Sequence, residues 1–313
     1  MKILITGAEG FVGRNVAEWF GRTDHDVLHP TRAELDLTDA DAVAGYFEDH
    51  RVDIIVHGAT TLREVTTYPP DTCENNLRMF FNLERQLTPS MRMFHLGSGS
   101  EYVRKYWHRK MPESFFGKHV PDDSHSYSKY VMSRYIEEAR GRNIVCLRIF
   151  GIFGKYEDYR YKFISNAIVK NVLRLPIVIS QNVVYDYLCV DDFNRMLEHF
   201  IAHEPRQRCY NVTPTEPIDL LTIARHINDI GTHQSEIQVL HEGIGVEYSG
   251  DNRLFLAEAG DFRFTPYRDA IAELYRHYQN LEDELDIAAI RKDEFLSYAK
   301  NLRAAYFEKK DAQ

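Results

Sequence analysis

The sequence predicts an α/β protein built on a doubly wound parallel sheet, and three observations indicate this class. Residues 2–6 form a short strand in which Ile3, Leu4 and Ile5 are consecutive apolar residues, as in a parallel strand buried on both faces. A glycine-rich turn and an amphipathic helix over residues 14–20 follow directly. Apolar runs of strand length then alternate with segments of helical apolar spacing through the first half of the chain.

Composition and charge narrow the possible function classes. The 313 residues are 44% hydrophobic and 27% charged, which is typical of a soluble globular protein with a sizeable core. The net charge is −9 without a basic block, so no nucleic-acid partner is expected. The first strand leaves no room for a signal peptide, and no apolar run reaches the roughly 20 residues that span a bilayer. The four cysteines show no paired spacing, so we expect structural thiols, no metal site and a cytoplasmic location.

Gly7, Gly10 and Gly13 mark the turn between the first strand and the first helix. The first glycine allows the turn, the second lets the backbone approach a pyrophosphate, and the third lets the helix pack closely on its strand. The helix N-terminus offers unpaired N–H groups and a partial positive charge to an anion. A glycine triplet also fits an ordinary tight turn, but the strand before it and the helix after it favour dinucleotide binding.

The other elements follow in chain order. Asp39 is an expected N-cap for a helix over residues 40–47. Further strands are predicted at residues 26–32 (which include the strand exit), 52–57, 93–96, 144–147, 176–179, 187–190 and 209–212. Further helices are predicted at residues 75–87, 126–139, 163–173, 192–201, 220–228 and, in the charged tail, 281–310. Because the alternation becomes less regular after residue 154, we predict a Rossmann-type dinucleotide-binding domain over residues 1–155 and a smaller α/β substrate lobe with a helical tail over residues 156–313.

The exit of the second strand bears on the choice of dinucleotide. Enzymes that bind NAD usually carry Asp or Glu there to hold the ribose 2′-hydroxyl, whereas an Arg nearby accommodates the 2′-phosphate of NADP. This exit carries Arg32, which favours NADP while leaving NAD possible. The alternative is that Arg32 is a solvated loop charge.

Small polar residues follow two more strands, at the carboxyl edge where ligands of a doubly wound sheet bind. Residues 58–61 end one strand, and Ser98 and Ser100 end the next. Such residues also fit plain turns, but their position favours a role in binding. Residues 103–124 are polar and irregular with interleaved aromatic residues, as in an active-site loop.

Several motifs along the chain carry a resemblance to a known family. They are the glycine turn, Asp36-Leu37, His57-Gly-Ala59, Asn76, Ser98 four residues before Tyr102, Ser128-Lys129, Leu147-Arg148 with Phe153-Gly154, and Tyr187-Leu-Cys-Val-Asp-Asp192. Together, over about residues 1–280, they resemble the extended short-chain dehydrogenases/reductases of the nucleotide-sugar epimerase, dehydratase and reductase group, which includes GDP-fucose synthase and UDP-galactose 4-epimerase.

The resemblance implies hydride transfer between a nicotinamide and a sugar carbon, most often C4. It implies that Ser98 bonds the sugar oxygen and that Lys129 holds the nicotinamide ribose. It places the dinucleotide against Gly7, Gly10, Phe11, Val12, Gly13, Arg32, Asp36, Leu37, Ala59, Asn76, Lys129 and Phe150, and the substrate against Thr61, Ser98, Ser100, Lys162 and Tyr185. It also implies a homodimer formed through the helices at residues 75–87 and 126–139. Residues 30–37 are most similar to GDP-fucose synthase, which gives a mild preference for a GDP-sugar.

The chain departs from this family at the acid–base residue. The family's Tyr-x-x-x-Lys presents both groups on one helix face, but His125 stands four residues before Lys129. His125 replaces the tyrosine, or the helix begins differently so that Tyr127 enters the site, or the site has lost catalysis and the protein is a dinucleotide-binding structural or regulatory subunit. In the first case, burial and the Lys129 charge should lower the pKa of His125 and favour oxidation.

A second departure concerns dehydration. Sugar 4,6-dehydratases of this family carry Thr-Asp-Glu where this chain has Ser98-Gly99-Ser100. Glu101 is one position away and is expected to point the other way along the strand. We therefore expect dehydrogenation, keto-reduction or epimerisation.

Overall fold

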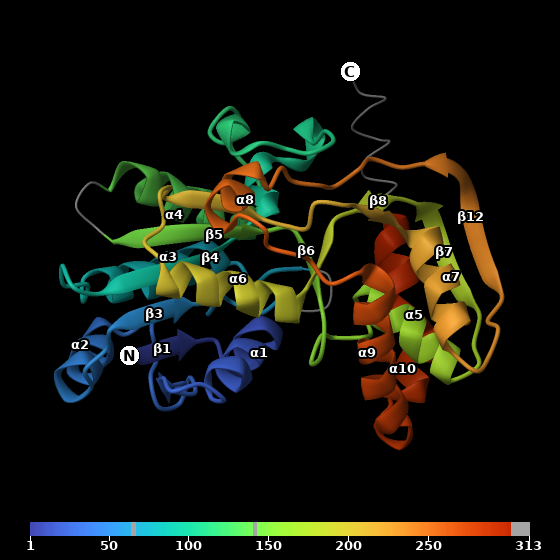
Figure 1. Ribbon diagram of the computed structural model, residues 1–313, viewed down its shortest axis with the longest axis horizontal. Helices are drawn as coiled ribbons and strands as arrows, with labels where there is room; N and C mark the ends of the chain where they lie inside the picture. The colour runs from blue at the N-terminus through green and yellow to red at the C-terminus, as the bar shows by residue number, and fades with distance from the viewer. Residues whose placement is uncertain (64–66, 140–142, 302–313) are drawn as a thin grey trace.

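The structure is a computed structural model that describes residues 1–63, 67–139 and 143–301. A six-stranded parallel sheet in the order β10-β5-β4-β3-β1-β2 occupies one end of the molecule (Figure 1). Its strands are β1 (Lys2–Thr6), β2 (Asp26–Leu28), β3 (Ile54–His57), β4 (Arg92–Ser98), β5 (Ile144–Ile149) and β10 (Cys209–Val212). The predicted α/β class with a doubly wound parallel sheet is confirmed.

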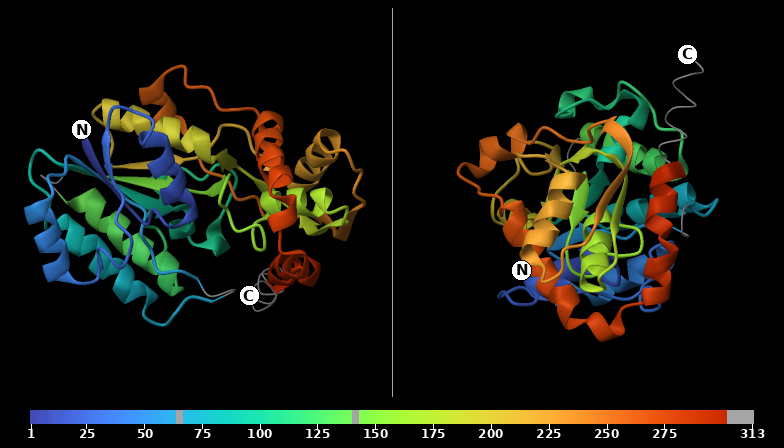
Figure 2. Two further views of the ribbon diagram at one scale, coloured as in Figure 1. Left: turned by 90° about the horizontal axis from the view of Figure 1, so that it is seen from below. Right: turned by 90° about the vertical axis from the view of Figure 1, so that its right-hand side faces the viewer.

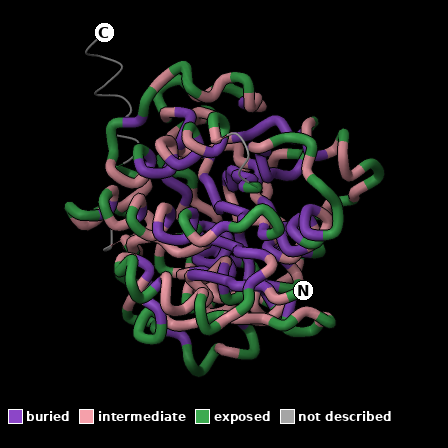
Figure 3. Tube along the Cα trace, turned by 90° about the vertical axis from the view of Figure 1, so that its left-hand side faces the viewer, coloured by how far each residue is buried: buried purple, intermediate pink, exposed green. Residues whose placement is uncertain are grey.

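Helices cover both faces of this sheet because successive side chains of each strand point to opposite faces. Leu4 and Ile55 lie in a core with the helices α2 (Ala40–Asp49), α3 (Thr72–Glu84) and α4 (Ser124–Glu138). Ile3 and Ile5 lie in a second core with α1 (Phe11–Phe20), α6 (Val190–Ala202) and α8 (Arg253–Ala259). The sheet is therefore buried between two helical layers, and Figure 3 shows buried segments in the interior of the molecule with exposed segments around them.

The strand order reverses direction beside β1. The chain leaves β1 toward β2 on one side and returns to β3 on the other. In a doubly wound sheet, this reversal opens a crevice outside the carboxyl ends of the strands, where ligands bind. The glycine turn after Thr6 and the segment after His57 lie at that edge.

The other end of the molecule is a smaller lobe with its own core (Figures 1 and 2). It contains the parallel pair β7 (Ile177–Asn182) and β12 (Ile237–Ile244). Its helices are α5 (Phe163–Val172), α7 (Leu220–Ile230), α9 (Tyr267–Asn280) and α10 (Ile287–Lys292). Short strands β6 (Gly151–Phe153), β8 (Val184–Tyr185), β9 (Tyr187–Cys189) and β11 (Ile218–Asp219) lie where the chain passes between the two ends. The division at residue 155 stays a prediction, and α6, β10 and α8 from the later part of the chain pack with the large sheet.

Element boundaries differ from the sequence-based expectations in a few places. The helix expected at residues 75–87 begins at Thr72, and the one expected at 126–139 begins at Ser124. The tail forms a short 3₁₀ turn, α10 and a further helical segment up to residue 301, and the rest of the expected tail helix lies outside the described residues. Within the described part of the chain, no helix is both long and apolar enough to cross a membrane.

Candidate active site

The glycine turn joins β1 to α1 through contacts that leave no room for side chains. Gly7 has a φ of +74°, a left-handed conformation that favours glycine. A Cβ on Gly13 would overlap the carbonyl oxygen of Gly7, so this glycine lets α1 pack directly on the turn. Among the described residues, no side chain caps the N-terminus of α1, and its first turn holds no acidic residue. The N–H groups at Phe11 and Val12 therefore fit the diphosphate of a dinucleotide.

Segments that follow β3 lie against this turn and are fixed to α4. A Cβ on Gly7 would be 2.8 Å from the backbone nitrogen of Ala59. Asn76 accepts the N–H of Thr61 at 2.8 Å and donates its own amide N–H to the Ser128 hydroxyl at 3.0 Å. Asn76 thus connects the end of β3 with the helix that carries Lys129.

Ser98 ends β4 and begins a 3₁₀ turn, η1 (Gly99–Tyr102). Its backbone N–H donates to Oε1 of Glu101 at 2.8 Å, which fixes the position of the residue. Its hydroxyl oxygen accepts hydrogen bonds from the N–H of Ser100 at 3.2 Å and from the Ser100 hydroxyl at 3.0 Å. The Ser98 O–H can therefore donate to a ligand oxygen at the end of β4.

Lys129 is buried beside the end of the same strand. Its ammonium donates a hydrogen bond to the carbonyl oxygen of Leu96, with 2.7 Å between Nζ and oxygen. Burial lowers the pKa of Lys129 to about 8, although the Glu101 carboxylate opposes this shift. The lysine is thus anchored at Leu96, two residues before Ser98, and its ammonium keeps two further N–H donors.

His125 lies in the first turn of α4, four residues before Lys129. The helix begins there because the Asp123 carboxylate accepts the N–H of Ser126 at 2.8 Å. Burial, and then the Lys129 charge, lowers the pKa of His125 to about 4, so the predicted direction is confirmed. Its Nδ1 is buried without a hydrogen-bond partner in the described part of the chain. At neutral pH the imidazole is uncharged and able to accept a proton.

Tyr127 does not take the place of the family's tyrosine in this structure. The helix runs regularly from Ser124, so Tyr127 projects from a different face than His125 and Lys129. Its side chain is 42% exposed. The alternative in which a shifted helix start brings Tyr127 into the site is not observed.

Glu101 is not on the strand, so the expectation that it points away along β4 is wrong. It lies in η1, fully buried, and forms an ion pair with Arg148 of β5 at 2.8 Å. The Arg148 guanidinium also lies 3.9 Å from the ring centre of Phe116. Because both oxygens of Glu101 are engaged, by Ser98 and by Arg148, this carboxylate has a positioning role and is not available to remove a proton from a substrate.

The predicted substrate residues lie in different environments. Lys162 is exposed at the N-cap of α5, in the small lobe, and its charge contributes to the lowered pKa of His125. Tyr185 of β8 packs against Tyr187 and Tyr248, with ring centres 5.1 and 5.9 Å apart, and burial raises its pKa. Thr61 and Ser100, by contrast, lie at the sheet edge near Asn76 and Ser98.

The residues predicted to contact the adenosine side or the nicotinamide side of the dinucleotide are in contact with other side chains of the protein. Arg32 is 80% exposed, with its guanidinium 3.9 Å from an Asp36 carboxylate oxygen, and Leu37 is buried in the core under α2 and α3. The ring of Phe150 packs with Tyr102 in a small aromatic cluster. The preference for NADP stays a prediction.

Three residues near these groups were not found by sequence reasoning. Tyr68 stacks on His125, the Tyr248 hydroxyl lies where a Cβ on Gly99 would be, and Glu9 bonds the backbone of Arg32. Glu9 could have been found from the sequence, because it is a charged residue inside the glycine turn. Tyr68 and Tyr248 come from distant loops, and no local pattern marks them.

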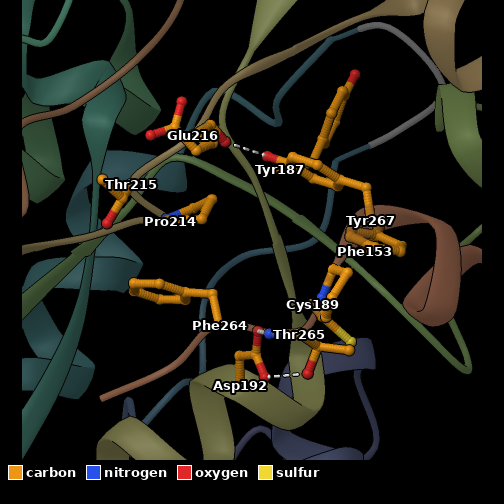
Figure 4. A pocket seen from close by; sticks show the side chains of 11 residues that line it. Phe153, Tyr187, Cys189, Asp192, Pro214, Thr215, Glu216, Phe264, Thr265 and Tyr267 are labelled. Carbon is orange, nitrogen blue, oxygen red and sulfur yellow. Dashed lines mark hydrogen bonds between the residues drawn. The ribbon is translucent and has the colours of Figure 1, made fainter. Parts of the chain in front are cut away.

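A cavity of about 190 Å³ lies beside the start of α6 and of α9 (Figure 4). Tyr187, Cys189 and Tyr267 are part of its lining, and Thr265 there donates from its hydroxyl to Asp192 at 2.7 Å. The described residues that line it do not include Ser98, His125 or Lys129. This cavity is therefore separate from the candidate catalytic groups.

Comparison with known proteins assigns the chain to one family. The family model "NAD dependent epimerase/dehydratase family" matches residues 3–213, so the chain belongs to this family. The resemblance recognised in the sequence is confirmed. The family depends on a nicotinamide dinucleotide, so this is the class of ligand that fits the glycine turn. Among the solved neighbours, one contains NADP and another contains NAD.

Three similar proteins show the range of the family. The chain is 25% identical over 295 residues to GDP-6-deoxy-D-talose 4-dehydrogenase of Aggregatibacter actinomycetemcomitans, which covers 88% of this chain and 98% of that protein. A GDP-mannoheptose C4 reductase from Campylobacter jejuni superposes with a TM-score of 0.75 at 15% identity, over 89% of this chain and 98% of that one. UDP-glucose 4-epimerase from Thermotoga maritima also gives a TM-score of 0.75 at 15% identity, over 90% and 99%.

Proposed function

We propose that the protein is an NAD(P)-dependent oxidoreductase or epimerase that acts on the sugar of a nucleotide-sugar by hydride transfer, with C4 as the reacting carbon. The observation that carries the proposal is the placement of His125 and Lys129 one helical turn apart at the carboxyl end of β4. Lys129 is bonded to the strand that ends at Ser98, at the same sheet edge as the glycine turn. A doubly wound sheet binds cofactor and substrate at this edge.

Each of the three residues has a role that fits its surroundings. The bound nicotinamide accepts or supplies the hydride. Ser98 donates a hydrogen bond to the sugar oxygen, and Lys129 holds the nicotinamide ribose. His125 takes the hydroxyl proton as the carbon loses its hydride, since the two must leave together. Because the pKa of His125 is about 4, its imidazole is unprotonated at neutral pH, so it can accept the hydroxyl proton but carries no proton for a ketone, and oxidation is the favoured direction.

A GDP-sugar is the favoured substrate. A relative that matches nearly the full chain is named as a dehydrogenase of a GDP-sugar, and a solved neighbour as a C4 reductase of another. The similarity of residues 30–37 to GDP-fucose synthase supports the same nucleotide. Thr61, Ser100, Lys162 and Tyr185 are the proposed substrate contacts. Residues 1–155, completed by α6, β10 and α8, are the proposed cofactor domain, and the rest of residues 156–313 the substrate lobe of a cytoplasmic homodimer.

The rival function is a dinucleotide-binding structural or regulatory subunit. The observation that favours it is His125 itself, because a histidine stands where the family's reactions use a tyrosine. In that case Lys129 and the glycine turn would still bind a dinucleotide, but no sugar would be oxidised or reduced.

One experiment separates the two functions. The purified full chain is incubated with NAD, NADH, NADP or NADPH and a panel of GDP-, UDP- and dTDP-sugars, and nicotinamide absorbance and the sugar products are followed. Conversion of a GDP-sugar that is lost in Lys129→Ala supports the proposal. Dinucleotide binding without turnover of any sugar contradicts it and supports the rival.

A further inference from the structure

Glu9 lies inside the glycine turn, between Gly7 and Gly10, and reaches across to the exit of β2. Its carboxylate oxygen Oε2 accepts the backbone N–H of Arg32 at 3.2 Å. The carboxylate therefore bridges the two segments between which the adenosine ribose lies in a doubly wound dinucleotide fold. It remains exposed to solvent and accessible to a ligand.

The guanidinium of Arg32 is directed to another partner. Its terminal nitrogen lies 3.9 Å from Oδ2 of Asp36. The same exit holds Glu34, whose carboxylate accepts the N–H and the hydroxyl of Thr31 at 2.8 and 2.9 Å. These hydrogen bonds lower the pKa of Glu34, and those from Thr38 lower the pKa of Asp36, so both are ionised at neutral pH.

The charges at this corner thus oppose a phosphate. Three residues of this corner carry carboxylates, Glu9, Glu34 and Asp36, and one carries a guanidinium, Arg32, which lies next to Asp36. A ribose 2′-phosphate would add about two negative charges at pH 7. A ribose hydroxyl, in contrast, donates a hydrogen bond to a carboxylate, and such charge-assisted bonds are the stronger kind.

We propose that Glu9 selects NAD(H) over NADP(H) by accepting a hydrogen bond from the adenosine ribose and repelling a 2′-phosphate. The inference rests on the proposed function in one respect, which is that the glycine turn binds a nicotinamide dinucleotide. It assigns to Glu9 the role that nicotinamide enzymes usually give to an acidic residue at the exit of β2. It opposes the preference for NADP that Arg32 suggested in the sequence.

The test measures binding, so it does not depend on an active enzyme. Dissociation constants of NADH and NADPH are measured by calorimetry for the full chain and for Glu9→Gln and Asp24→Asn. Glu9→Gln removes the charge and keeps the side-chain size. Asp24→Asn removes one charge as well, but before β2, at the opposite end of that strand.

We expect NADH to bind more tightly than NADPH by about tenfold or more, because a hydrogen bond to a charged group contributes roughly 1.5–3 kcal/mol. Glu9→Gln should reduce this ratio at least about fivefold, mainly by tightening NADPH, while Asp24→Asn leaves it within about twofold.

Two results would overturn the inference in distinguishable ways. NADPH binding as tightly as NADH in the unmutated protein, or a ratio insensitive to Glu9→Gln, would remove the role of Glu9 and leave the proposed function intact. Absence of binding of both dinucleotides would remove the proposed function and this inference together.

Discussion

The imidazole of His125 lies parallel to the phenol ring of Tyr68, with ring centres 4.5 Å apart and planes inclined by 2°. The stacked ring excludes water from one face of the imidazole, which disfavours its charged form. Burial is accordingly the largest cause of the lowered pKa of His125, ahead of the Lys129 charge. The loop after β3 therefore helps to keep a residue on α4 unprotonated.

The first prediction concerns catalysis by His125. A positioned base contributes typically about 10²–10⁴-fold to rate, so His125→Ala should lower turnover by that factor while dinucleotide affinity stays nearly unchanged. His125→Tyr restores the family's pair and should raise the reductive rate. His203→Ala, an exposed histidine at the end of α6, is the control and should keep full turnover. Full turnover of His125→Ala would mean that the base is elsewhere, with Tyr127 the next residue to test.

The second prediction is the pH dependence of the oxidative reaction. His125 must be unprotonated to act as a base, so kcat/KM should fall as pH drops below about 4. Lys129 loses its charge as pH rises through about 8, so kcat/KM should also fall above that pH. Tyr68→Ala exposes the imidazole and should move the acidic limb toward the free-histidine pKa of about 6.5. An acidic limb that Tyr68→Ala does not move would contradict this assignment.

The third prediction concerns the buried ion pair of Glu101 and Arg148. Removing Glu101 takes from the buried Arg148 guanidinium its fully buried partner, and breaking such a pair costs about 3–5 kcal/mol, so Glu101→Gln should lower the free energy of unfolding in urea by up to that amount. Turnover should fall as well, because Glu101 also holds the backbone of Ser98. Glu137 bonds the same guanidinium at 3.2 Å from a partly exposed position, so Glu137→Gln is the matched control, with an expected loss under about 1 kcal/mol. Equal losses in the two variants would refute the special role of the buried pair.

The fourth prediction concerns stability and Glu157. Burial raises the pKa of this carboxyl from 4.5 to about 7, and the Ser165 hydroxyl is its hydrogen-bond donor. The folded state therefore binds more protons than the unfolded state between these values, and stability falls as pH rises through that window. Glu157→Gln should remove this loss and gain on the order of 2–3 kcal/mol over the unmutated protein between pH 4 and pH 8. The exposed Glu198→Gln should show no such gain, and a pH-independent difference for Glu157→Gln would contradict the prediction.

The fifth prediction is a homodimer formed through α3 and α4. The two helices pack on each other and still present partly exposed apolar side chains, among them Leu77 and Phe81. An isologous contact of these helices would bury that surface. Sedimentation at micromolar concentration should show a dimer that Leu77→Glu weakens. A monomer at all such concentrations would exclude this interface.

Local patterns predicted the parts of the fold that local chemistry determines. The glycine turn, the strand before it and the helix after it follow from Gly7, Gly10 and Gly13, and the spacing of His125 and Lys129 predicts their common helix face. The position of Glu101 was not predictable in this way. Its side chain meets Arg148 from the next strand, and a strand-alternation argument fails once the chain turns into η1 after Ser98.

Contacts between distant segments explain the other gaps. The Tyr68 stacking on His125 depends on where the loop after β3 lies, which no short stretch encodes. The pairing of β12 with β7 likewise joins strands separated by the helices α6 and α7. The tertiary fold creates both features, so they become visible only when it is known.

The path of the chain also determines how this protein can be divided. Within the described residues, the backbone passes between the large sheet and the small lobe five times. The passages lie between β6 and α5, between β9 and α6, between β10 and α7, between β12 and α8, and between α8 and α9. Neither half is therefore one contiguous fragment that an expression plasmid could encode by a single truncation. Exchanging the substrate lobe with that of a relative would require a separate junction at each passage, whereas a loop graft at residues 103–121 would need only two. Attempts to redirect substrate choice by recombination are best confined to such loops.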